Sequence, residues 1–387
     1  MQADIKAWAW RTPLGNDTDT VIARLLAGQR AARPNARFDA ASYACTLAGD
    51  ITGEPDMVRH RRFLRRMGMF AVEVAIEAMA RAGLSGGDRV GLFFGYGGLR
   101  AHWNDMMPAF EHQRSDGDDS WNKGLSLLHP FWMLQHLSNN AHALAAQELG
   151  ARGEGATYGG ANAGAQALAA AIRSLAAGAV DAALVVGYDS LIEPETLVEL
   201  GQRGALTRGG LPALLAPYDS AACGFVPAEA AAAMVLQRPG EGGATLARVQ
   251  ALDAADGGHG EVGTATLAHL IGQHGQRGDV VDGCGLANPR FDAAERSAAA
   301  HVVGDDAPLC CIMAAMGQTG AASSIVQSIA LTELLRRGLL APIAGLQSAA
   351  PGPLSPVLAA QSMTNRSAIC LSTGAPGLAG IVRVCLA

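Results

Sequence analysis

The stretch that decides the fold is Thr157-Tyr158-Gly159-Gly160-Ala161-Asn162-Ala163-Gly164, together with the residues that follow it. A run rich in alanine extends from this turn to Gly178 and predicts a helix that ends at a glycine. The apolar segment 182–186, Ala-Ala-Leu-Val-Val, comes next and predicts a buried strand. A helix followed directly by a buried strand is typical of an α/β protein in which helices cover a sheet.

The same alternation extends outward from this stretch in both directions. We expect a strand over 90–94, helical structure over 131–149 and a further strand over 231–236. The sequence Pro-Gly-Glu-Gly-Gly at 239–243 then interrupts the pattern. A second series follows, with strands expected at 244–249, 279–281 and 381–386 and a helix at 321–337. We therefore predict two similar α/β halves, 1–240 and 241–387, related by internal duplication.

Composition narrows the classes of protein that fit this chain. Of its 387 residues, 49% are hydrophobic and only 17% are charged, which predicts a large buried fraction. The net charge of -6 gives no overall positive field, so we expect no nucleic-acid partner. The start of the chain lacks a basic segment followed by an apolar one, and no uninterrupted apolar run of about 18 residues occurs. We expect a cytoplasmic protein without a membrane segment.

The cysteines and histidines provide no sign of a metal or cofactor site. Seven cysteines form neither a CxxC pair nor a compact framework, so we expect free and mostly buried thiols. The ten histidines lack the spacing of metal ligands; His136 and His142, for example, do not share one helix face. We predict that the protein has no metal and no cofactor.

Five segments in order along the chain resemble motifs of the β-ketoacyl synthase family. Two keep the family pattern: TPLGND at 12–17 with LLAG at 25–28, and PYD at 217–219 with GFV at 224–226 and Glu229. The other three, 157–164, 280–323 and 372–380, correspond to the places where the family keeps its catalytic groups. The resemblance implies a duplicated thiolase fold with five layers in the order α-β-α-β-α.

The family's nucleophile is a cysteine in a T-A-C-x-x-G turn at the start of a helix. There the unpaired N–H groups and the helix dipole favour a thiolate and bind the thioester oxyanion. Counting back three positions from Gly164 places Ala161 where the family has this cysteine.

The first catalytic histidine of the family heads an H-G-T-G-T turn after a strand. The resemblance places Asp282 at that position, although Asp292 and Glu295 then follow about two residues later than the family's acids do. We expect Asp282 to be a solvated or hydrogen-bonded turn residue and not a general base. Cys284 lies in the same turn, and we expect it to be a buried thiol and not a displaced nucleophile.

The remaining catalytic positions are also changed. Gln318 stands at the second histidine, with one residue deleted before the next glycine, and Met313 stands at the lysine. Ala375 stands at the phenylalanine that gates the acyl site. Alanine cannot attack a thioester, and neither Asp nor Gln replaces imidazole as a donor near neutral pH. The pair Cys310 and Cys311 precedes this motif, but no histidine follows His301 to activate either thiol.

Within the family, loss of every catalytic group is typical of the chain-length factor. This resemblance implies a non-catalytic subunit that pairs with an active ketosynthase and shapes its acyl tunnel in polyketide or aryl-polyene biosynthesis, with acyl carrier protein as a further partner. An alternative is a stand-alone homodimer that catalyses acyl transfer or decarboxylation with Asn162, Asp282 and Gln318. A third is an inactive scaffold that only stabilises another protein.

Three surfaces follow from the resemblance. Trp132, Met133 and His136 lie in the stretch 121–142 that crosses the dimer interface and lines the tunnel in ketosynthases; the alternative is ordinary helix core. The segment 59–66 supplies candidates for docking an acidic carrier protein, or for surface ion pairs: Arg61, Arg62, Arg65 and Arg66. For the subunit interface we predict the strand 182–186 and the helix after Ala161.

Overall fold

The structure is a computed structural model that describes residues 1–97, 103–116, 121–211, 214–255, 264–373 and 378–387. Its first half contains a sheet in the order β5-β4-β6-β7-β1. The strands β4, β5 and β6 run parallel, whereas β7 is antiparallel to both β6 and β1. Their bounds are β1 Ala3–Arg11, β4 Val90–Tyr96, β5 Ala156–Gly159, β6 Ala182–Ser190 and β7 Glu229–Gln237.

The second half repeats this topology. Its sheet has the order β10-β9-β14-β15-β8, with β9, β10 and β14 parallel and β15 antiparallel to β14 and β8. The bounds are β8 Ala247–Ala255, β9 Val280–Asp282, β10 Pro308–Cys310, β14 Ser367–Ser372 and β15 Leu378–Cys385. In each half the chain order of the strands across the sheet is third, second, fourth, fifth and first. The repeated strand order confirms the predicted duplication. The boundary between residues 240 and 241 remains a prediction, and the repeat supports it.

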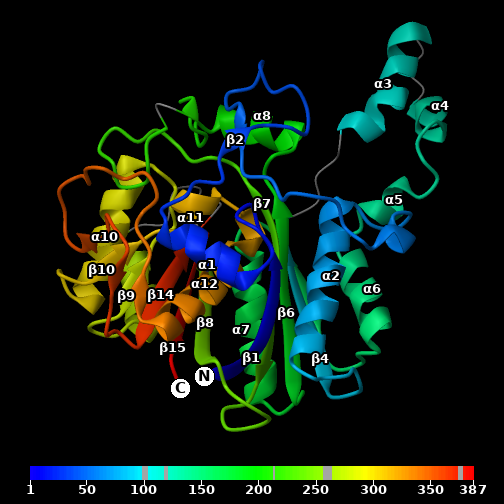
Figure 1. Cartoon of the computed structure of the whole chain (residues 1–387). Helices are drawn as coiled ribbons and strands as arrows, with labels where there is room; N and C mark the ends of the chain where they lie inside the picture. Colours follow the sequence, from blue (N-terminus) through cyan, green and yellow to red (C-terminus); the bar gives the residue numbers. More distant parts are fainter. Residues whose placement is uncertain (98–102, 117–120, 212–213, 256–263, 374–377) are drawn as a thin grey trace.

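The two sheets are joined where β1 pairs with β8 over Ala3–Ile5. Two helices, α7 (Ala163–Ala176) and α12 (Ser323–Arg337), lie between the sheets, because each contacts strands of both halves. The outer faces are covered by α2 (Arg66–Arg81) and α6 (Asn140–Leu149) on one side and by α9 (Thr264–His274) and α10 (Pro289–Val303) on the other (Figure 1). The predicted five layers, α-β-α-β-α, are confirmed.

Short elements connect these layers. They are α1 (Thr18–Leu26), α8 (Pro194–Gln202), α11 (Ile312–Met316), the 3-10 turns η1 (Val58–His60) and η3 (Gly320–Ala322), and the two-residue strands β2 (Arg33–Pro34), β3 (Leu47–Ala48), β11 (Leu339–Leu340), β12 (Ser355–Pro356) and β13 (Gln361–Ser362). Across the described ranges, no helix combines the length and apolar character needed to cross a membrane.

An arm leaves the body between β4 and α6. It consists of α3 (Trp103–Asp116), α4 (Trp121–Ser126) and α5 (Trp132–Gln135), and we call its described residues 103–116 and 121–137 the arm. Figure 1 shows α3 and α4 extending well beyond the layers. The helix predicted over 131–149 is wrong as a single element, since α5 and α6 are separate. The Asn140 amide donates to the carbonyl of Leu134 (2.6 Å) and thereby competes with helical hydrogen bonding at the break.

The predicted interface strand is in the interior of the sheet. Strand β6 is hydrogen-bonded to β4 on one side and to β7 on the other, so it has no open edge for a partner chain. Helix α7 is buried between the two sheets. The prediction that 182–186 and the helix after Ala161 form the subunit interface is therefore wrong. The sheet of the first half ends instead at β5.

The start of α7 fits between the sheets because glycine stands where the backbones approach. A methyl group at Gly164 would overlap the carbonyl oxygen of Ala321 in η3. At Gly187 in β6, a methyl group would lie 2.9 Å from the Ile325 side chain. These contacts bring the turn at Ala161, the end of β6 and η3 together.

We expect Gly164→Ala to lower the free energy of unfolding by about 2 kcal/mol or more, because the added methyl group has no space. The matched control is Gly272→Ala in the exposed face of α9, where no atom lies near the new methyl group. That control should be neutral or stabilise by up to about 1 kcal/mol, since alanine favours helix. Urea denaturation followed by circular dichroism compares the two, and equal effects would contradict this packing argument.

Candidate functional site

The turn at Ala161 meets the segment that ends β14. Asn162 precedes the first residue of α7 and is buried. Its Oδ1 accepts a hydrogen bond from the Ser372 hydroxyl (3.0 Å). Ala375, which follows in the same segment, lies outside the described residues. Gly164 also packs against Ala321, which belongs to the segment after Gln318. Three segments that are far apart in the sequence therefore meet at this site.

Gln318 connects the segment 280–286 with the segment 224–229. Its side-chain amide donates to the carbonyl oxygen of Cys284, and its backbone N–H donates to the carbonyl of Val226 (2.8 Å). The Gln318 carbonyl accepts from the N–H of Ala228 (2.8 Å). The side chain is buried, with 4% of its surface exposed. Its amide N–H therefore holds the loop after β9 in place.

Asp282 is the last residue of β9 and is fully buried, so the expectation of a solvated turn residue is wrong. The expectation of a hydrogen-bonded one is confirmed. Its Oδ1 accepts from the N–H of Ile312 and its Oδ2 from the side-chain amide of Gln327, both at 2.8 Å. Burial raises the pKa of Asp282 to about 7, although both hydrogen bonds act in the opposite direction. This carboxyl group fixes β9 to α11 and α12.

The turn after β9 brings Cys284, two residues further on, to Gln318. The Cys284 N–H donates to Glu295 Oε1 (2.8 Å), while its carbonyl accepts from Gln318. If Cys284 and not Asp282 is aligned with the histidine, Asp292 and Glu295 follow it at the distance that the family's acidic residues have. The assignment of Asp282 to the first histidine stays a prediction, and these two observations favour Cys284 instead.

Neither Cys284 nor the following thiols resemble a nucleophile. Cys284, Cys310 and Cys311 are all buried, and burial raises the pKa of each thiol above its usual range. Cys311 precedes α11, but this helix has only five residues. The expectation of buried thiols is confirmed at these positions. Met313, at the family's lysine, is likewise buried, with its sulfur 3.6 Å from the Thr319 hydroxyl.

Sequence reasoning missed the network around Tyr218. This residue has a φ of +68°, which is unusual for a side chain of this size, and it is almost fully buried. Its N–H donates to Asp292 Oδ2 (2.9 Å) and its hydroxyl donates to Glu295 Oε2 (2.6 Å). Burial raises the pKa of Asp292 to about 7 and also raises that of Glu295. The available signal was tyrosine in place of phenylalanine in the P-F-D motif.

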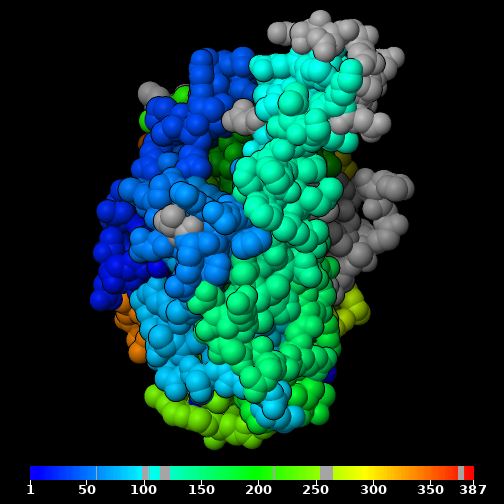
Figure 2. Space-filling model, turned by 90° about the vertical axis from the view of Figure 1, so that its right-hand side faces the viewer, coloured from blue at the N-terminus to red at the C-terminus, as the bar shows by residue number. Residues whose placement is uncertain are grey.

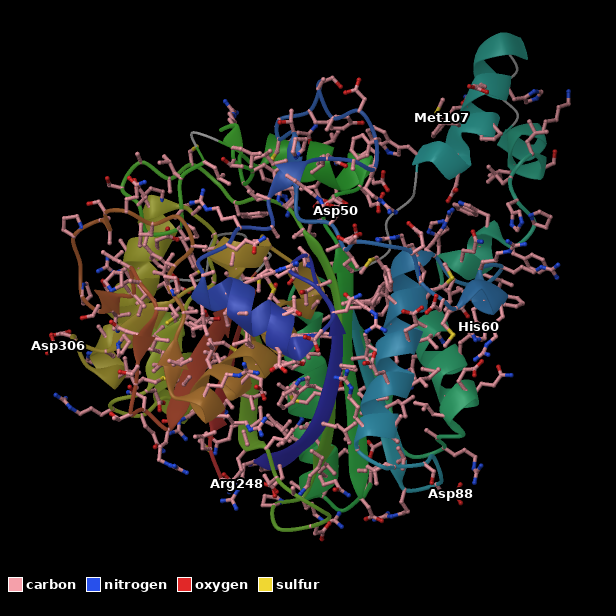
Figure 3. All side chains as sticks on the ribbon, viewed as in Figure 1. Asp50, His60, Asp88, Met107, Arg248 and Asp306 are labelled. Atoms are coloured by element: carbon pink, nitrogen blue, oxygen red, sulfur yellow. The ribbon has the colours of Figure 1, made fainter. Side chains whose placement is uncertain are left out.

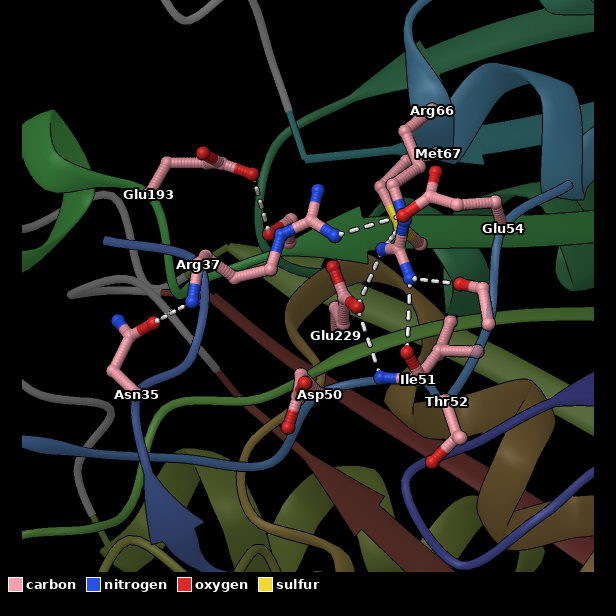
Figure 4. Close-up of polar contacts among 12 residues, drawn as sticks. Asn35, Arg37, Asp50, Ile51, Thr52, Glu54, Arg66, Met67, Glu193 and Glu229 are labelled. Atoms are coloured by element: carbon pink, nitrogen blue, oxygen red, sulfur yellow. Dashed lines mark hydrogen bonds and ion pairs between the residues drawn. The ribbon is translucent and has the colours of Figure 1, made fainter.

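Two of the four docking arginines have internal partners. Arg66 Nη1 lies 2.6 Å from Glu229 Oε1, and Nη2 donates to the carbonyls of Ile51 and Gly53 at 2.9 Å (Figure 4). Its guanidinium also lies 4.7 Å from the centre of the Phe70 ring. Arg65 forms an ion pair with Asp105 of the arm. These contacts exclude Arg66 as a docking residue.

Arg61 and Arg62, in contrast, are exposed on the surface before α2. Among the described residues, no group of three or more His, Cys, Asp or Glu side chains is placed to hold a metal ion.

The tunnel candidates lie on α5 and at its end. The rings of Trp132 and His136 are 5.3 Å apart, and His136 Nε2 lies 3.2 Å from Asp105 Oδ2. Met133 is 61% exposed. A cavity of about 310 Å³ lies nearby; His136 lines it, whereas Trp132 and Met133 do not.

Comparison with known proteins decides the family. Residues 4–241, more than half of the chain, match the model described as "Beta-ketoacyl synthase, N-terminal domain". The chain belongs to the β-ketoacyl synthase family. It is 28% identical over 239 residues to 3-oxoacyl-(acyl-carrier-protein) synthase 2 of Synechocystis sp., and this match spans 58% of the chain and 55% of the Synechocystis protein.

Solved structures agree with this fold over the whole chain. A β-ketoacyl synthase from Burkholderia phymatum STM815 is 20% identical, with a TM-score of 0.87, and the ishigamide ketosynthase/chain length factor is 21% identical, with a TM-score of 0.85. Each match covers 100% of this chain and 99% of the solved one. A type II polyketide ketosynthase in complex with its acyl carrier protein is 17% identical, with a TM-score of 0.84 and the same coverage of both chains. The fold is the thiolase fold of ketosynthases.

We expect Asp282→Asn to reduce the dependence of stability on pH. Because the folded pKa of Asp282 is raised from 3.8 to about 7, its favourable contribution is fully present below about pH 4 and is lost as the pH rises through 7. Wild-type stability should therefore fall between pH 5 and pH 7, by on the order of 1 kcal/mol for each pH unit and each such group, and level off above pH 7. Urea denaturation across this range measures the slope, which Asp282→Asn should lower.

The control for this experiment is Asp306→Asn, an exposed position on the far side of the second half (Figure 3). It should leave the slope unchanged. An Asp282→Asn slope equal to that of the wild type would show that this carboxyl group is ionised in the folded protein at pH 5.

Proposed function

We propose that this chain is a non-catalytic, chain-length-factor subunit that pairs with an active β-ketoacyl synthase in polyketide or polyene biosynthesis. The observation that carries the proposal is Ala161 at the start of α7, where the family requires a thiolate. A methyl group can neither attack a thioester nor hold an acyl chain.

The other groups at the site support this proposal. Gln318 donates its amide hydrogen to a backbone carbonyl, and Asp282 accepts two hydrogen bonds in the core. Both side chains thus have structural partners in place of a reacting carbonyl. The buried thiols of Cys284 and Cys311 have raised pKa values and supply no thiolate.

One observation favours the alternative of a stand-alone acyltransferase or decarboxylase. The Nδ2 of Asn162 is buried at the N-terminal end of α7, and within the described ranges no acceptor lies in hydrogen-bond reach of it. Such an amide could polarise a thioester carbonyl. The alternative retains only Asn162, however, because Asp282 and Gln318 have the structural partners described above.

The arm supports the presence of a second subunit. Nine of the thirteen large hydrophobic side chains that are exposed among the described residues lie on it: Trp103, Met107, Phe110, Leu125, Leu127, Phe131, Met133, Leu134 and Leu137. Figure 2 shows the arm above the face formed by α2 and α6. Apolar side chains gathered on a projecting segment are typical of a surface that binds another protein. We infer that a ketosynthase covers this surface and that Trp132 and Met133 limit its acyl tunnel.

The solved relatives include a ketosynthase/chain length factor and a ketosynthase with its acyl carrier protein. By this analogy, acyl carrier protein is a further partner of the complex. Arg61 and Arg62 remain its docking candidates in this chain because they are exposed and basic, and acyl carrier proteins are acidic.

We expect the purified chain to catalyse no condensation of acyl and malonyl carrier proteins, and Ala161→Cys not to restore it. The new thiol lacks an imidazole partner, because Asp282, Cys284 and Gln318 stand in the two segments where the family has its catalytic histidines. Product analysis measures turnover, a catalytically complete ketosynthase is the positive control, and intact-protein mass spectrometry detects acylation. Covalent acylation of the wild-type chain would overturn the proposal, and turnover of the natural chain without acylation would favour the Asn162 alternative.

We expect Met107→Glu and Met133→Glu to weaken binding to the cognate ketosynthase by about tenfold or more each, since a charge replaces a side chain that the partner buries. Met107 lies on the projecting α3 (Figure 3). The matched control is Leu358→Glu, at a position in the second half that is similarly exposed, at 54%. Native mass spectrometry and isothermal titration measure the complex. A stable homodimer that does not exchange with any ketosynthase would overturn the pairing.

The scaffold hypothesis is tested in the same reconstituted complex. If Trp132→Ala and Met133→Ala leave product length unchanged while the complex remains intact and active, this chain only stabilises its partner.

A further inference from the structure

A small cavity is lined by the loop 214–217 and is separate from the larger cavity beside the arm. Its volume is about 20 Å³, which accommodates one water molecule or one monatomic ion and is far too small for an ordinary organic ligand. Both halves of the chain form its wall, with Phe225 from the first half and Gly285 and Met313 from the second. Leu215 lines the cavity and is 38% exposed, so the cavity lies close to the surface.

Arg30 is the one charged side chain among the described residues that line this cavity, and all the others are apolar. Its Nε donates to the carbonyl of Ala344 (3.1 Å) and its Nη1 donates to the carbonyl of Leu214 (2.6 Å). A methyl group at Gly345 would overlap the guanidinium, so this group lies closely against the backbone there. These contacts fix a cation in an otherwise apolar wall.

The guanidinium of Arg30 keeps unused hydrogen-bond donors. It has five N–H hydrogens, and the two bonds to carbonyl groups use two of them. Its Nη2 is buried and, within the described ranges, has no acceptor in hydrogen-bond reach. A buried donor without an acceptor is costly, and a charged one more so. Arg30 therefore favours a ligand that accepts hydrogen bonds.

Arg30 also lacks a counter-charge. Burial lowers the pKa of its guanidinium below the usual range, and no charged group in the described part of the chain acts against this effect. Other poorly exposed arginines have a carboxylate: Arg66 Nη1 lies 2.6 Å from Glu229 Oε1, and Arg383 Nε lies 2.9 Å from Asp279 Oδ2. Buried charges are paired as a rule, because an unpaired charge loses its hydration without compensation. A water molecule in the cavity would supply an acceptor but leave the charge unpaired, whereas an anion supplies both.

We infer that this cavity binds one small inorganic anion, chloride, beside the guanidinium of Arg30. The ion accepts from charged donors and carries the single negative charge that balances the wall. Larger anions such as phosphate exceed the available volume. Because Arg30 connects the loop 214–217 with Ala344 in the second half, a bound ion stabilises the contact between the two halves. This inference goes beyond the proposed function and depends neither on catalysis nor on the partner subunit.

The first test measures the stability of the complete chain alone in urea, with sodium chloride replacing sodium gluconate at constant ionic strength. Gluconate is too large for the cavity and is the reference anion. An ion that binds only the folded state raises the folding equilibrium constant by one plus the ratio of its concentration to its Kd. We expect a rise of about tenfold on exchange to chloride at an ionic strength of about 0.15 M. Equal stability in the two salts overturns the inference.

A variant assigns the effect to Arg30. Arg30→Gln should abolish the difference between the two salts, because it removes the cation from the cavity wall. The matched control is Arg152→Gln, which removes the same charge from an exposed ion pair with Asp88 (2.6 Å) at the end of the molecule opposite to the arm (Figure 3). It should retain the full chloride effect. Circular dichroism checks each fold, and a chloride effect that persists in a folded Arg30→Gln variant overturns the inference.

Bromide locates the ion in crystals of the wild-type chain and decides the matter if Arg30→Gln is unfolded. It has the same charge as chloride and scatters X-rays anomalously. We expect an anomalous peak in the cavity, within hydrogen-bond distance of a guanidinium nitrogen of Arg30. Peaks confined to other positions, which would mean an adventitious ion only, overturn the inference.

Discussion

The rest of the structure depends on the close approach of α7 to η3 between the two sheets. Gly164 has no space for a methyl group at this contact, and the turn before it sets the direction in which α7 enters the central layer. Each sheet packs one face against α7 or α12, so a displaced helix would expose apolar surface of both halves. The turn is therefore under a packing constraint that is independent of catalysis. This explains why the glycine frame of 157–164 remains although Ala161 provides no nucleophile.

The same reasoning applies to the other changed positions. In a synthase the groups of this region must stay available to substrate, whereas here they bind one another. Asp282 ties β9 to α11 and α12, Gln318 holds the loop at Cys284, and the Tyr218 hydroxyl reaches Glu295. These hydrogen bonds satisfy buried polar atoms, which are costly to leave without partners. Under the proposed function, hydrogen bonds typical of a protein interior take the place of catalytic contacts at these positions.

Much of the fold could be predicted from the sequence because period and turn chemistry are local. The helix after Ala161, the strand at 182–186 and the duplication all follow from such patterns. The wrong predictions concern position within the assembled layers. The residues 182–186 do not indicate whether β6 lies at an edge or in the interior of the sheet, because an apolar sequence is compatible with either position. Arg66 likewise belongs to a basic run, and only the fold brings it to Glu229, 163 residues away. Similarly, the residues that line the cavity of about 310 Å³ come from segments whose proximity no local pattern encodes.

The strand β5 forms an open edge of the sheet. Within the described sheet it pairs with β4 alone, and it is short, with partly exposed side chains. An open strand edge presents free N–H and C=O groups that any extended peptide can extend into a larger sheet. Under the proposed function, a chain made without its ketosynthase partner leaves both this edge and the apolar arm uncovered, and such surfaces promote aggregation. On that proposal, balanced synthesis of the two subunits keeps these surfaces covered.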